Sequence, residues 1–297
     1  MRNSFRILSL ALLSSLYGCS SLTFLAVNTP AAFGHYSKHT DVSYADQARN
    51  KLDVYAPESL KAPMPVVIFV HGGGWNNGDK SQYKFVGAAF AEQGYVAVLP
   101  NYRLYPEIKS PAFYEDIAAV VFFVRAHVSE WGGDPERIYL VGHSAGAQIA
   151  MMIALNDQYL HEFGGSSAWI RGVVGLAGPY DFLPFTRPYM NDLFGPPDHF
   201  AASQPINYVR ANAPPLLLMH GLQDHTVAPT NTRHLYDAMT SIGGKVQVQY
   251  FETATHSDLI AAFSFIRNRK PPVIALINQF VATENASRTG SSQAGAR

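Results

Sequence analysis

The sequence predicts an α/β fold in which a mostly parallel sheet carries helices on both faces. Three observations support this prediction: apolar runs rich in β-branched residues, helical patterns that alternate with these runs, and glycine-rich segments directly after two of them. Parallel strands need crossover connections, and a strand buried on both faces has a continuous apolar run. The 297 residues are 47% hydrophobic and 15% charged, a composition that supports one large core.

The predicted strands and helices follow one another in regular alternation. Strands are expected at 66–70, 95–99, 138–141, 172–176, 216–219 and 246–251. Helices are expected at 82–93, 111–130, 145–156, 230–242 and 271–282. Apolar residues at helical spacing, as in 116–124, indicate a helix face that packs on the sheet. The sheet is expected to start with antiparallel strands around residues 40–56.

Both ends of the chain are predicted to lie outside this fold. Residues 1–18 carry two arginines near their start, Arg2 and Arg6, followed by a short apolar stretch. This pattern is typical of a signal peptide, and the stretch is too short for a transmembrane helix. Residues 19–39 are expected to form a tether. Residues 284–297 are small and polar without periodicity, which predicts a disordered tail. The folded domain is therefore expected to span residues 40–283.

The segment Leu16-Tyr17-Gly18-Cys19 resembles the cleavage box of bacterial lipoproteins, in which the cysteine receives a diacylglycerol. Tyr17 departs from the small residue usual at that position, and Ser20 after the cysteine favours the outer membrane by the same resemblance. Cys19 is the only cysteine of the chain, so an exported form has no internal disulfide. We expect a protein anchored to the bacterial envelope membrane through Cys19 and facing the periplasm. An ordinary signal peptide with an incidental thiol is the alternative.

Charge and composition argue against several classes of function. The chain has 22 Lys and Arg against 22 Asp and Glu, so a formal net charge of zero offers no electrostatic basis for nucleic-acid binding. Its 11 histidines form neither an HExxH motif nor a Cys/His cluster, so neither a metal nor another cofactor is expected. The oligomeric state is left open.

The segment Gly142-His143-Ser144-Ala145-Gly146 follows the predicted strand 138–141 and precedes a helical pattern. In a tight strand-to-helix turn, only small residues fit two positions before and two positions after the serine. The serine is then held in a strained, exposed conformation with its hydroxyl free to react. This G-x-S-x-G pattern predicts that Ser144 is a nucleophile.

A serine nucleophile needs a base to accept its proton and an acid to orient that base. Asp224 follows the predicted strand 216–219, and His256 follows the predicted strand 246–251. Both side chains are therefore expected on loops at the carboxyl edge of the sheet. Their order along the chain, serine then aspartate then histidine, fits a catalytic triad. Asp181, after the strand 172–176, is the alternative acid.

The segment His71-Gly72-Gly73-Gly74-Trp75 directly follows a predicted strand. Consecutive glycines let a backbone pass close to a substrate with its N–H groups unobstructed. No Gly-Lys-Ser/Thr follows and no G-x-G-x-x-G is present, which argues against a phosphate or dinucleotide site. We assign the oxyanion hole to the N–H groups of Gly73, Gly74 and Ala145.

Other residues near these motifs receive supporting roles. His220 and His225 lie too close to the acid in sequence to be its partner, and His143 is expected to point away from the nucleophile. His71 is expected to brace the glycine loop through hydrogen bonds. Trp75 and His143 are the candidates for the walls of the substrate pocket.

Together, the HGGGW and GHSAG motifs, the Asp224 loop and His256 resemble the HGGG-motif α/β-hydrolases, the hormone-sensitive-lipase-like carboxylesterases. The branch with bacterial feruloyl-esterase-like proteins, isoprenylcysteine methylesterases and kynurenine formamidases is the most similar. The resemblance covers roughly residues 40–282 and includes Leu52-Asp53-Val54-Tyr55-Ala56-Pro57, Gly78-Asp79-Lys80, Asn101-Tyr102-Arg103-Leu104 and 132–137. It implies an α/β-hydrolase fold with an eight-stranded sheet, and a role for Tyr102 and Arg103 in stabilising the glycine loop.

The segment 181–212 is expected to be a short cap insertion. It holds five prolines and several aromatic residues, which predicts a kinked cover rather than a helical lid. Lipase-like relatives carry long N-terminal cap helices, and this chain has little sequence between Cys19 and its first predicted strand. A small cap predicts an open pocket for short or medium acyl groups or for bulky aromatic esters.

These observations predict a serine carboxylesterase that hydrolyses small-molecule esters, short-chain, medium-chain or aromatic, through an acyl-enzyme on Ser144. An arylformamidase-type amide hydrolase would use the same residues, because a triad does not by itself choose esters over amides. A non-catalytic envelope lipoprotein that uses the fold as a binding module is the third possibility.

Overall fold

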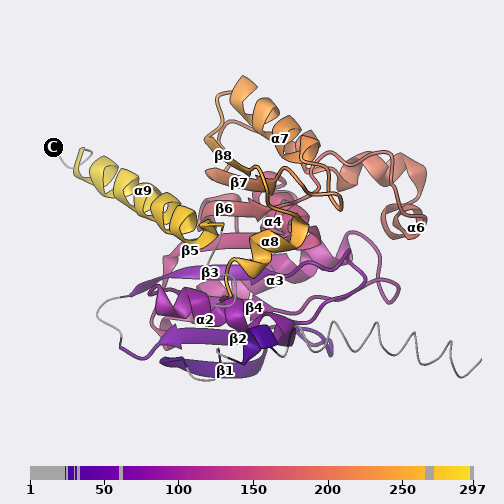
Figure 1. Ribbon diagram of the computed structural model, residues 1–297. Coiled ribbons are helices and arrows are strands. Elements are labelled where there is room, and N and C mark those ends of the chain that lie inside the picture. The colour runs from indigo at the N-terminus through magenta and orange to yellow at the C-terminus, as the bar shows by residue number, and fades with distance from the viewer. Residues whose placement is uncertain are drawn as a thin grey trace, which may run out of the picture.

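A computed structural model describes residues 24, 26–29, 31, 34–59, 63–264 and 271–294. Within these ranges, eight strands form one sheet in the order β1-β2-β4-β3-β5-β6-β7-β8 (Figure 1). The strands are β1 (Tyr36–Ser43), β2 (Lys51–Pro57), β3 (Met64–Val70), β4 (Val96–Pro100), β5 (Gly133–His143), β6 (Ile170–Leu176), β7 (Leu216–Gly221) and β8 (Val246–Phe251). β2 pairs antiparallel with β1 and β4, and all other pairs are parallel. The predicted fold class is confirmed.

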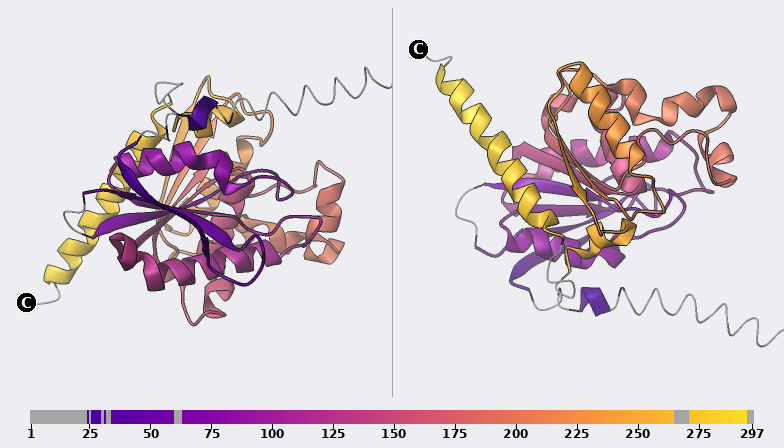
Figure 2. Two further views of the ribbon diagram at one scale, coloured as in Figure 1. Left: turned by 90° about the horizontal axis from the view of Figure 1, so that it is seen from below. Right: turned by 45° about the horizontal axis from the view of Figure 1, so that its top comes forward.

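Helices cover both faces of the sheet, as the edge-on view of Figure 2 shows. Val66, Ile68 and Val70 of β3 join one hydrophobic core, while Val67 and Phe69 join the other. The first core includes residues of α3 (Ala112–His127), α4 (Ala145–Leu155) and α7 (Thr230–Ser241). The second includes residues of α2 (Lys84–Glu92), α8 (His256–Ala261) and α9 (Val273–Ala294). Successive side chains of a strand point to opposite faces, so two covered faces require the continuous apolar run.

Shorter elements connect this framework. They are the 3-10 helices η2 (Lys80–Tyr83), η3 (Val128–Trp131) and η4 (Ser167–Trp169) and the short helix α5 (Gln158–His161). Between β6 and β7 lie α6 (Tyr189–Phe194), η5 (Pro197–Ser203) and η6 (Pro205–Tyr208). In this part of the chain, Phe185 packs with its ring centroid 5.3 Å from Phe194 and 4.7 Å from Phe200. Aromatic packing therefore holds the cover over the carboxyl edge of the sheet, without a long helix.

The last helix extends beyond the end expected for the domain. The sequence predicts a disordered tail from residue 284, but α9 continues to Ala294. The Arg171 guanidinium on β6 donates to the Glu284 carbonyl at 2.6 Å, and the Tyr139 hydroxyl on β5 donates to the Asn285 side chain at 2.8 Å. These contacts hold the helix at the boundary where the tail was expected to begin. Because extending a formed helix is far easier than starting one, the helix continues past this boundary.

The predicted signal peptide and Cys19 lie outside the described residues, so the lipid anchor stays a prediction. None of the helices in the described ranges combines the length and the apolar character that crossing a bilayer requires.

Candidate active site

Ser144 lies in the strained turn between β5 and α4. Its φ of 55° and ψ of −124° are uncommon for a residue other than glycine. The turn is held by a 2.9 Å hydrogen bond from the Ser144 N–H to the Leu176 carbonyl on β6. A Cβ atom at Gly142 would lie 2.3 Å from the Gly146 oxygen, and one at Gly146 would lie 2.1 Å from the Val70 oxygen. Both glycines are therefore required, as the spacing predicts.

Asp224 and His256 meet where β7 and β8 end. The His256 Nδ1 atom lies 2.7 Å from Asp224 Oδ2, and the Asp224 side chain is fully buried. Asp224 Oδ1 accepts the N–H groups of Thr226 and Val227 at 2.8 and 2.9 Å. Burial alone would raise the pKa of Asp224, but hydrogen bonds from His220, His256 and Val227 together hold it well below its ordinary value. The carboxylate thus stays charged and orients the imidazole.

The alternative acid, Asp181, has a different partner. Its Oδ2 atom lies 2.7 Å from Nδ1 of His234, a residue of α7. In the described part of the structure His256 is therefore paired with Asp224, and Asp181 does not contact the candidate triad.

Sequence reasoning missed a second histidine on the Asp224 carboxylate. His220 Nε2 lies 3.2 Å from Asp224 Oδ2 and 3.0 Å from the Val227 carbonyl, and its Nδ1 lies 2.7 Å from the Thr232 hydroxyl. The His220 side chain is fully buried. His220 is close to Asp224 in sequence, which argued against a role as the base. The same short spacing lets His220, at the end of β7, contact the carboxylate of Asp224 in addition to His256.

Ser144 and His256 line one cavity of about 600 Å³, together with Gly73, Gly74 and Ala145. Among the contacts of the described residues, no hydrogen bond joins the Ser144 hydroxyl to His256. His256 Nδ1 is engaged by Asp224, so Nε2 is the nitrogen left for proton transfer. Such hydrogen bonds are often long without substrate and tighten when it binds. In the described ranges, no group of three His, Cys, Asp or Glu residues is placed to hold a metal ion.

The glycine loop presents unobstructed amides to this cavity. Gly73 and Gly74 have φ values of 128° and 59°, and a Cβ atom there would lie 2.1 Å from the Asn77 oxygen or 2.8 Å from the Tyr189 hydroxyl. Ala145 is the first residue of α4, so its N–H has no acceptor within the helix. The described hydrogen bonds include none donated by these three amides. An oxygen bound in the cavity can therefore accept from them.

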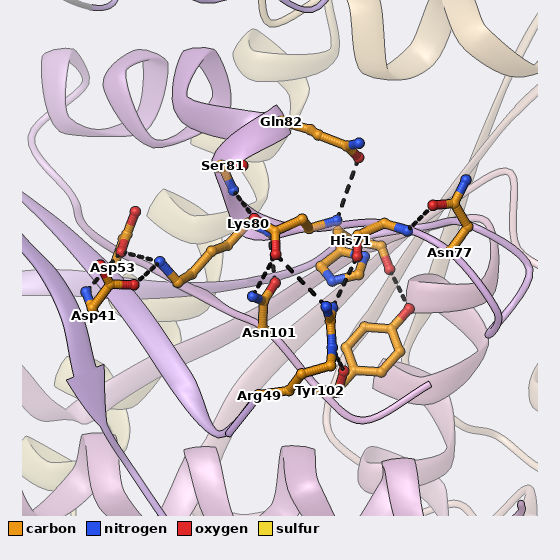
Figure 3. A network of polar contacts seen from close by, with 12 residues as sticks. Asp41, Arg49, Asp53, His71, Asn77, Lys80, Ser81, Gln82, Asn101 and Tyr102 are labelled. Atoms are coloured by element: carbon orange, nitrogen blue, oxygen red, sulfur yellow. Dashed lines mark hydrogen bonds and ion pairs between the residues drawn. The ribbon is translucent and has the colours of Figure 1, made fainter. Parts of the chain in front are cut away.

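His71 and Tyr102 brace the glycine loop. The Tyr102 hydroxyl donates to the His71 carbonyl at 2.9 Å, and the two rings stack with centroids 4.5 Å apart. The Arg49 guanidinium donates to the carbonyls of Tyr102 and Gly78 at 2.8 and 2.9 Å (Figure 3). Arg103 instead forms an ion pair with a carboxylate of α3. The resemblance thus holds for Tyr102, whereas Arg49 takes the place expected for Arg103.

The two pocket candidates differ in what they contact. Trp75 lines the cavity but is only 2% exposed, and its indole N–H donates to Gln148 at 3.1 Å. It stacks on Phe182 of the cover at 5.7 Å between centroids. His143 also lines the cavity, and its Nε2 lies 3.1 Å from the His256 carbonyl. Trp75 therefore joins the glycine loop to the cover, and His143 holds the loop that carries His256.

A buried ion pair anchors the segment that follows the glycine loop (Figure 3). Lys80 Nζ lies 2.6 Å from Asp53 on β2 and 2.7 Å from Asp41 on β1. The Asn101 side chain accepts the Lys80 N–H and donates to Asp79, both at 2.7 Å. These contacts tie the loop to β1, to β2 and to the residue that follows β4.

Replacing Lys80 with methionine is expected to destabilise the fold. The Asp53 side chain is 3% exposed, and Lys38, its other cation, is 3.9 Å away. Removing one partner of a buried pair leaves an uncompensated charge and typically costs about 3–5 kcal/mol. Urea unfolding should show a loss of that order, whereas Lys245→Met, at an exposed position, should show almost none. Equal stability of the two variants would contradict this assignment.

Two buried histidines should make the stability depend on pH. Burial lowers the pKa of His71 to about 4 and that of His143 to about 3, against about 6.5 in an unfolded chain. As the pH falls from about 6.5 towards 4, the unfolded chain binds protons that the folded protein does not, so the free energy of unfolding decreases. We expect the free energy of unfolding, measured with urea at pH 7, 6 and 5, to decrease less steeply with falling pH in His71→Gln than in the parent. His199→Gln, at an exposed position, serves as the control. If the free energy of unfolding depends on pH equally steeply in His71→Gln and in the parent, the prediction is wrong.

The sequence comparisons find one matching family model and relatives that are esterases. The family model described as BD-FAE matches residues 52–239. A probable isoprenylcysteine alpha-carbonyl methylesterase of Arabidopsis thaliana is 30% identical over 259 residues, which are 80% of this chain and 54% of that protein. Esterase LipC of Mycobacterium tuberculosis is 30% identical over 269 residues, which are 80% of this chain and 66% of that protein. The chain thus spans about half to two thirds of the length of these relatives.

Solved structures of esterases share the fold. Esterase B from Lactobacillus rhamnosis superposes with a TM-score of 0.76 at 21% identity, over 96% of this chain and 98% of that one. A truncated carbohydrate esterase from gut microbiota gives a TM-score of 0.72 at 20% identity, over 86% of this chain and 98% of that one. At these identities the likeness establishes the α/β-hydrolase fold.

Proposed function

Because this chain belongs to the BD-FAE family of α/β-hydrolase carboxylesterases, we propose that it is a serine carboxylesterase that forms an acyl-enzyme on Ser144. The observation that carries the proposal is the Asp224–His256 contact of 2.7 Å beside the cavity that Ser144 lines. Gly73, Gly74 and Ala145 line the same cavity, so the residues proposed as nucleophile, base and oxyanion donors border one space.

Each step of ester hydrolysis then has a group to perform it. Ser144 attacks the carbonyl carbon while His256 Nε2 accepts the hydroxyl proton, and Asp224 holds the imidazole through Nδ1. The three amides stabilise the oxyanion of the tetrahedral intermediate. His256 then protonates the leaving alcohol, and a water molecule hydrolyses the acyl-enzyme by the same route. Because its pKa is held low, Asp224 stays ionised throughout.

The cavity supports esters with short or medium acyl chains or with aromatic groups. Its walls include Trp75, Phe182, Leu183 and Met190, which are apolar, and its volume of about 600 Å³ suits a drug-sized molecule. Leu183 and Arg187, which line the cavity from the cover between β6 and β7, are exposed, so the cavity is accessible to solvent.

The proposal is tested by a substrate panel and a covalent probe. We expect the purified full-length protein to hydrolyse 4-nitrophenyl esters faster than N-formyl anilides, and a fluorophosphonate probe to label Ser144, as located by peptide mapping. Faster cleavage of the formyl anilides would assign an amide hydrolase instead. Absence of both labelling and turnover would favour a binding module and overturn the proposal.

A further inference from the structure

The cavity beside Ser144 carries a single permanently cationic side chain. Among the described residues that line it, Arg187 is the only arginine or lysine. The only carboxylate among them is Asp181, whose Oδ2 atom is engaged by His234 at 2.7 Å. The remaining walls are mainly apolar or neutral, so the positive charge of Arg187 is distinctive there.

The Arg187 guanidinium has no partner within the described part of the chain: it forms neither a hydrogen bond nor an ion pair, and the residue is exposed. By contrast, Arg49 and Arg103 near the glycine loop are both bound to carbonyls or carboxylates. A guanidinium offers several N–H donors in a planar fork that matches a carboxylate. Arg187 is therefore free to receive one from a ligand.

Arg187 is also connected to the candidate reaction centre. It lies two residues before the first residue of α6, Tyr189, whose hydroxyl donates to the Gly74 carbonyl at 2.9 Å. Burial raises the pKa of Tyr189, and the positive charge of Arg187 opposes that rise, which places this charge within electrostatic reach of the hydroxyl. A ligand held by the glycine-loop amides would thus extend towards Arg187.

We propose that Arg187 makes this cavity selective for esters that carry a carboxylate on the acyl or alcohol part. The ester carbonyl would lie at the amides of the glycine loop, the apolar body would contact residues such as Phe182 and Met190, and the carboxylate would accept hydrogen bonds from Arg187. This inference rests on the proposed esterase function and specifies its substrate class. Arg187 acts on substrate binding and takes no part in proton transfer.

The test compares carboxylates with carboxamides of the same shape. One pair is the 4-nitrophenyl half-ester of adipic acid and the 4-nitrophenyl ester of its monoamide, which probe the acyl side. The other is the butyrate esters of 4-hydroxybenzoic acid and 4-hydroxybenzamide, which probe the alcohol side. The quantity compared is the kcat/KM of the carboxylate divided by the kcat/KM of the matching carboxamide. For at least one pair, this ratio should be about tenfold lower in Arg187→Gln than in the parent, because the variant loses a charged hydrogen bond. In Arg187→Glu the ratio should fall further, and in the parent it should decline with added salt.

Two variants control for the general effect of charge. Arg233→Gln removes the same charge from an exposed position on α7 that does not line the cavity, and its ratio should match the parent. Asp181→Asn removes the opposing carboxylate and should raise the ratio. If esters are hydrolysed but Arg187→Gln leaves both ratios unchanged, or Arg233→Gln lowers them equally, the inference is overturned and the proposed function stands. If no ester is hydrolysed and no probe reacts, the proposed function itself fails.

Discussion

Alanine at position 144 is expected to lower kcat for a short-chain ester by about 10⁶-fold, the scale seen when a triad serine is removed. Without the hydroxyl no acyl-enzyme forms, and only binding and oxyanion stabilisation remain to assist direct attack by water. The turn should survive, because its hydrogen bond to Leu176 comes from the backbone and both flanking glycines remain. The measurements are kcat with 4-nitrophenyl butyrate and the thermal unfolding midpoint.

Ser241→Ala is the matched control, since Ser241 is an exposed hydroxyl at the end of α7. It should keep the parent's kcat and its reactivity with a fluorophosphonate. A Ser144→Ala protein that folds normally and keeps more than about a hundredth of the parent's kcat would be incompatible with a serine nucleophile at this position.

Alanine at position 256 is expected to abolish acyl-enzyme formation almost as completely, because loss of the base costs a triad about as much as loss of the nucleophile. His143, whose ring centroid lies 4.8 Å from that of His256, should not replace it. Burial is the largest cause that lowers the pKa of His143, and it remains when His256 is removed, so the His143 ring stays a weak base. The readout is the pre-steady-state burst of 4-nitrophenol, measured with substrate in excess over enzyme.

His225→Ala is the informative comparison, because His225 is next to Asp224 in sequence but exposed, and it makes no hydrogen bond among the described residues. Its burst should be close to that of the parent. If His225→Ala loses the burst and His256→Ala keeps it, the base has been assigned to the wrong histidine.

Local constraints explain why the nucleophile and the glycine loop could be predicted from the sequence. At Gly142 and Gly146 a Cβ atom would collide with backbone oxygens a few residues away or on the neighbouring strand. Gly73 and Gly74 adopt positive φ values that favour glycine. Where a backbone conformation admits only one residue type, that residue in the sequence predicts the conformation. The pairing of Asp224 with His256 was predicted by a weaker argument, that loops after adjacent parallel strands share one edge.

Contacts between distant segments could not be predicted in the same way. Asp181 and Asp224 both follow strands, and their roles are separated by two contacts of 2.7 Å, that of Asp224 with His256 and that of Asp181 with His234. Arg49 takes the bracing position expected for Arg103 because it lies beside the carbonyls of Tyr102 and Gly78. Such choices depend on side-chain positions to within an ångström or so, which no spacing in the sequence encodes.

The amino-acid sequence by itself determined the fold class, the turn at Ser144 and the glycine loop, since apolar periodicity and glycine positions follow from local backbone geometry. The tertiary structure decided which carboxylate orients His256, that His220 supports Asp224, that α9 continues to Ala294, and that Arg187 borders the cavity without a partner. The pairing of Asp224 with His256 and the contacts that hold α9 arise because the strand order brings together residues more than thirty positions apart. Their energies depend on distances and burial that exist only in the folded chain.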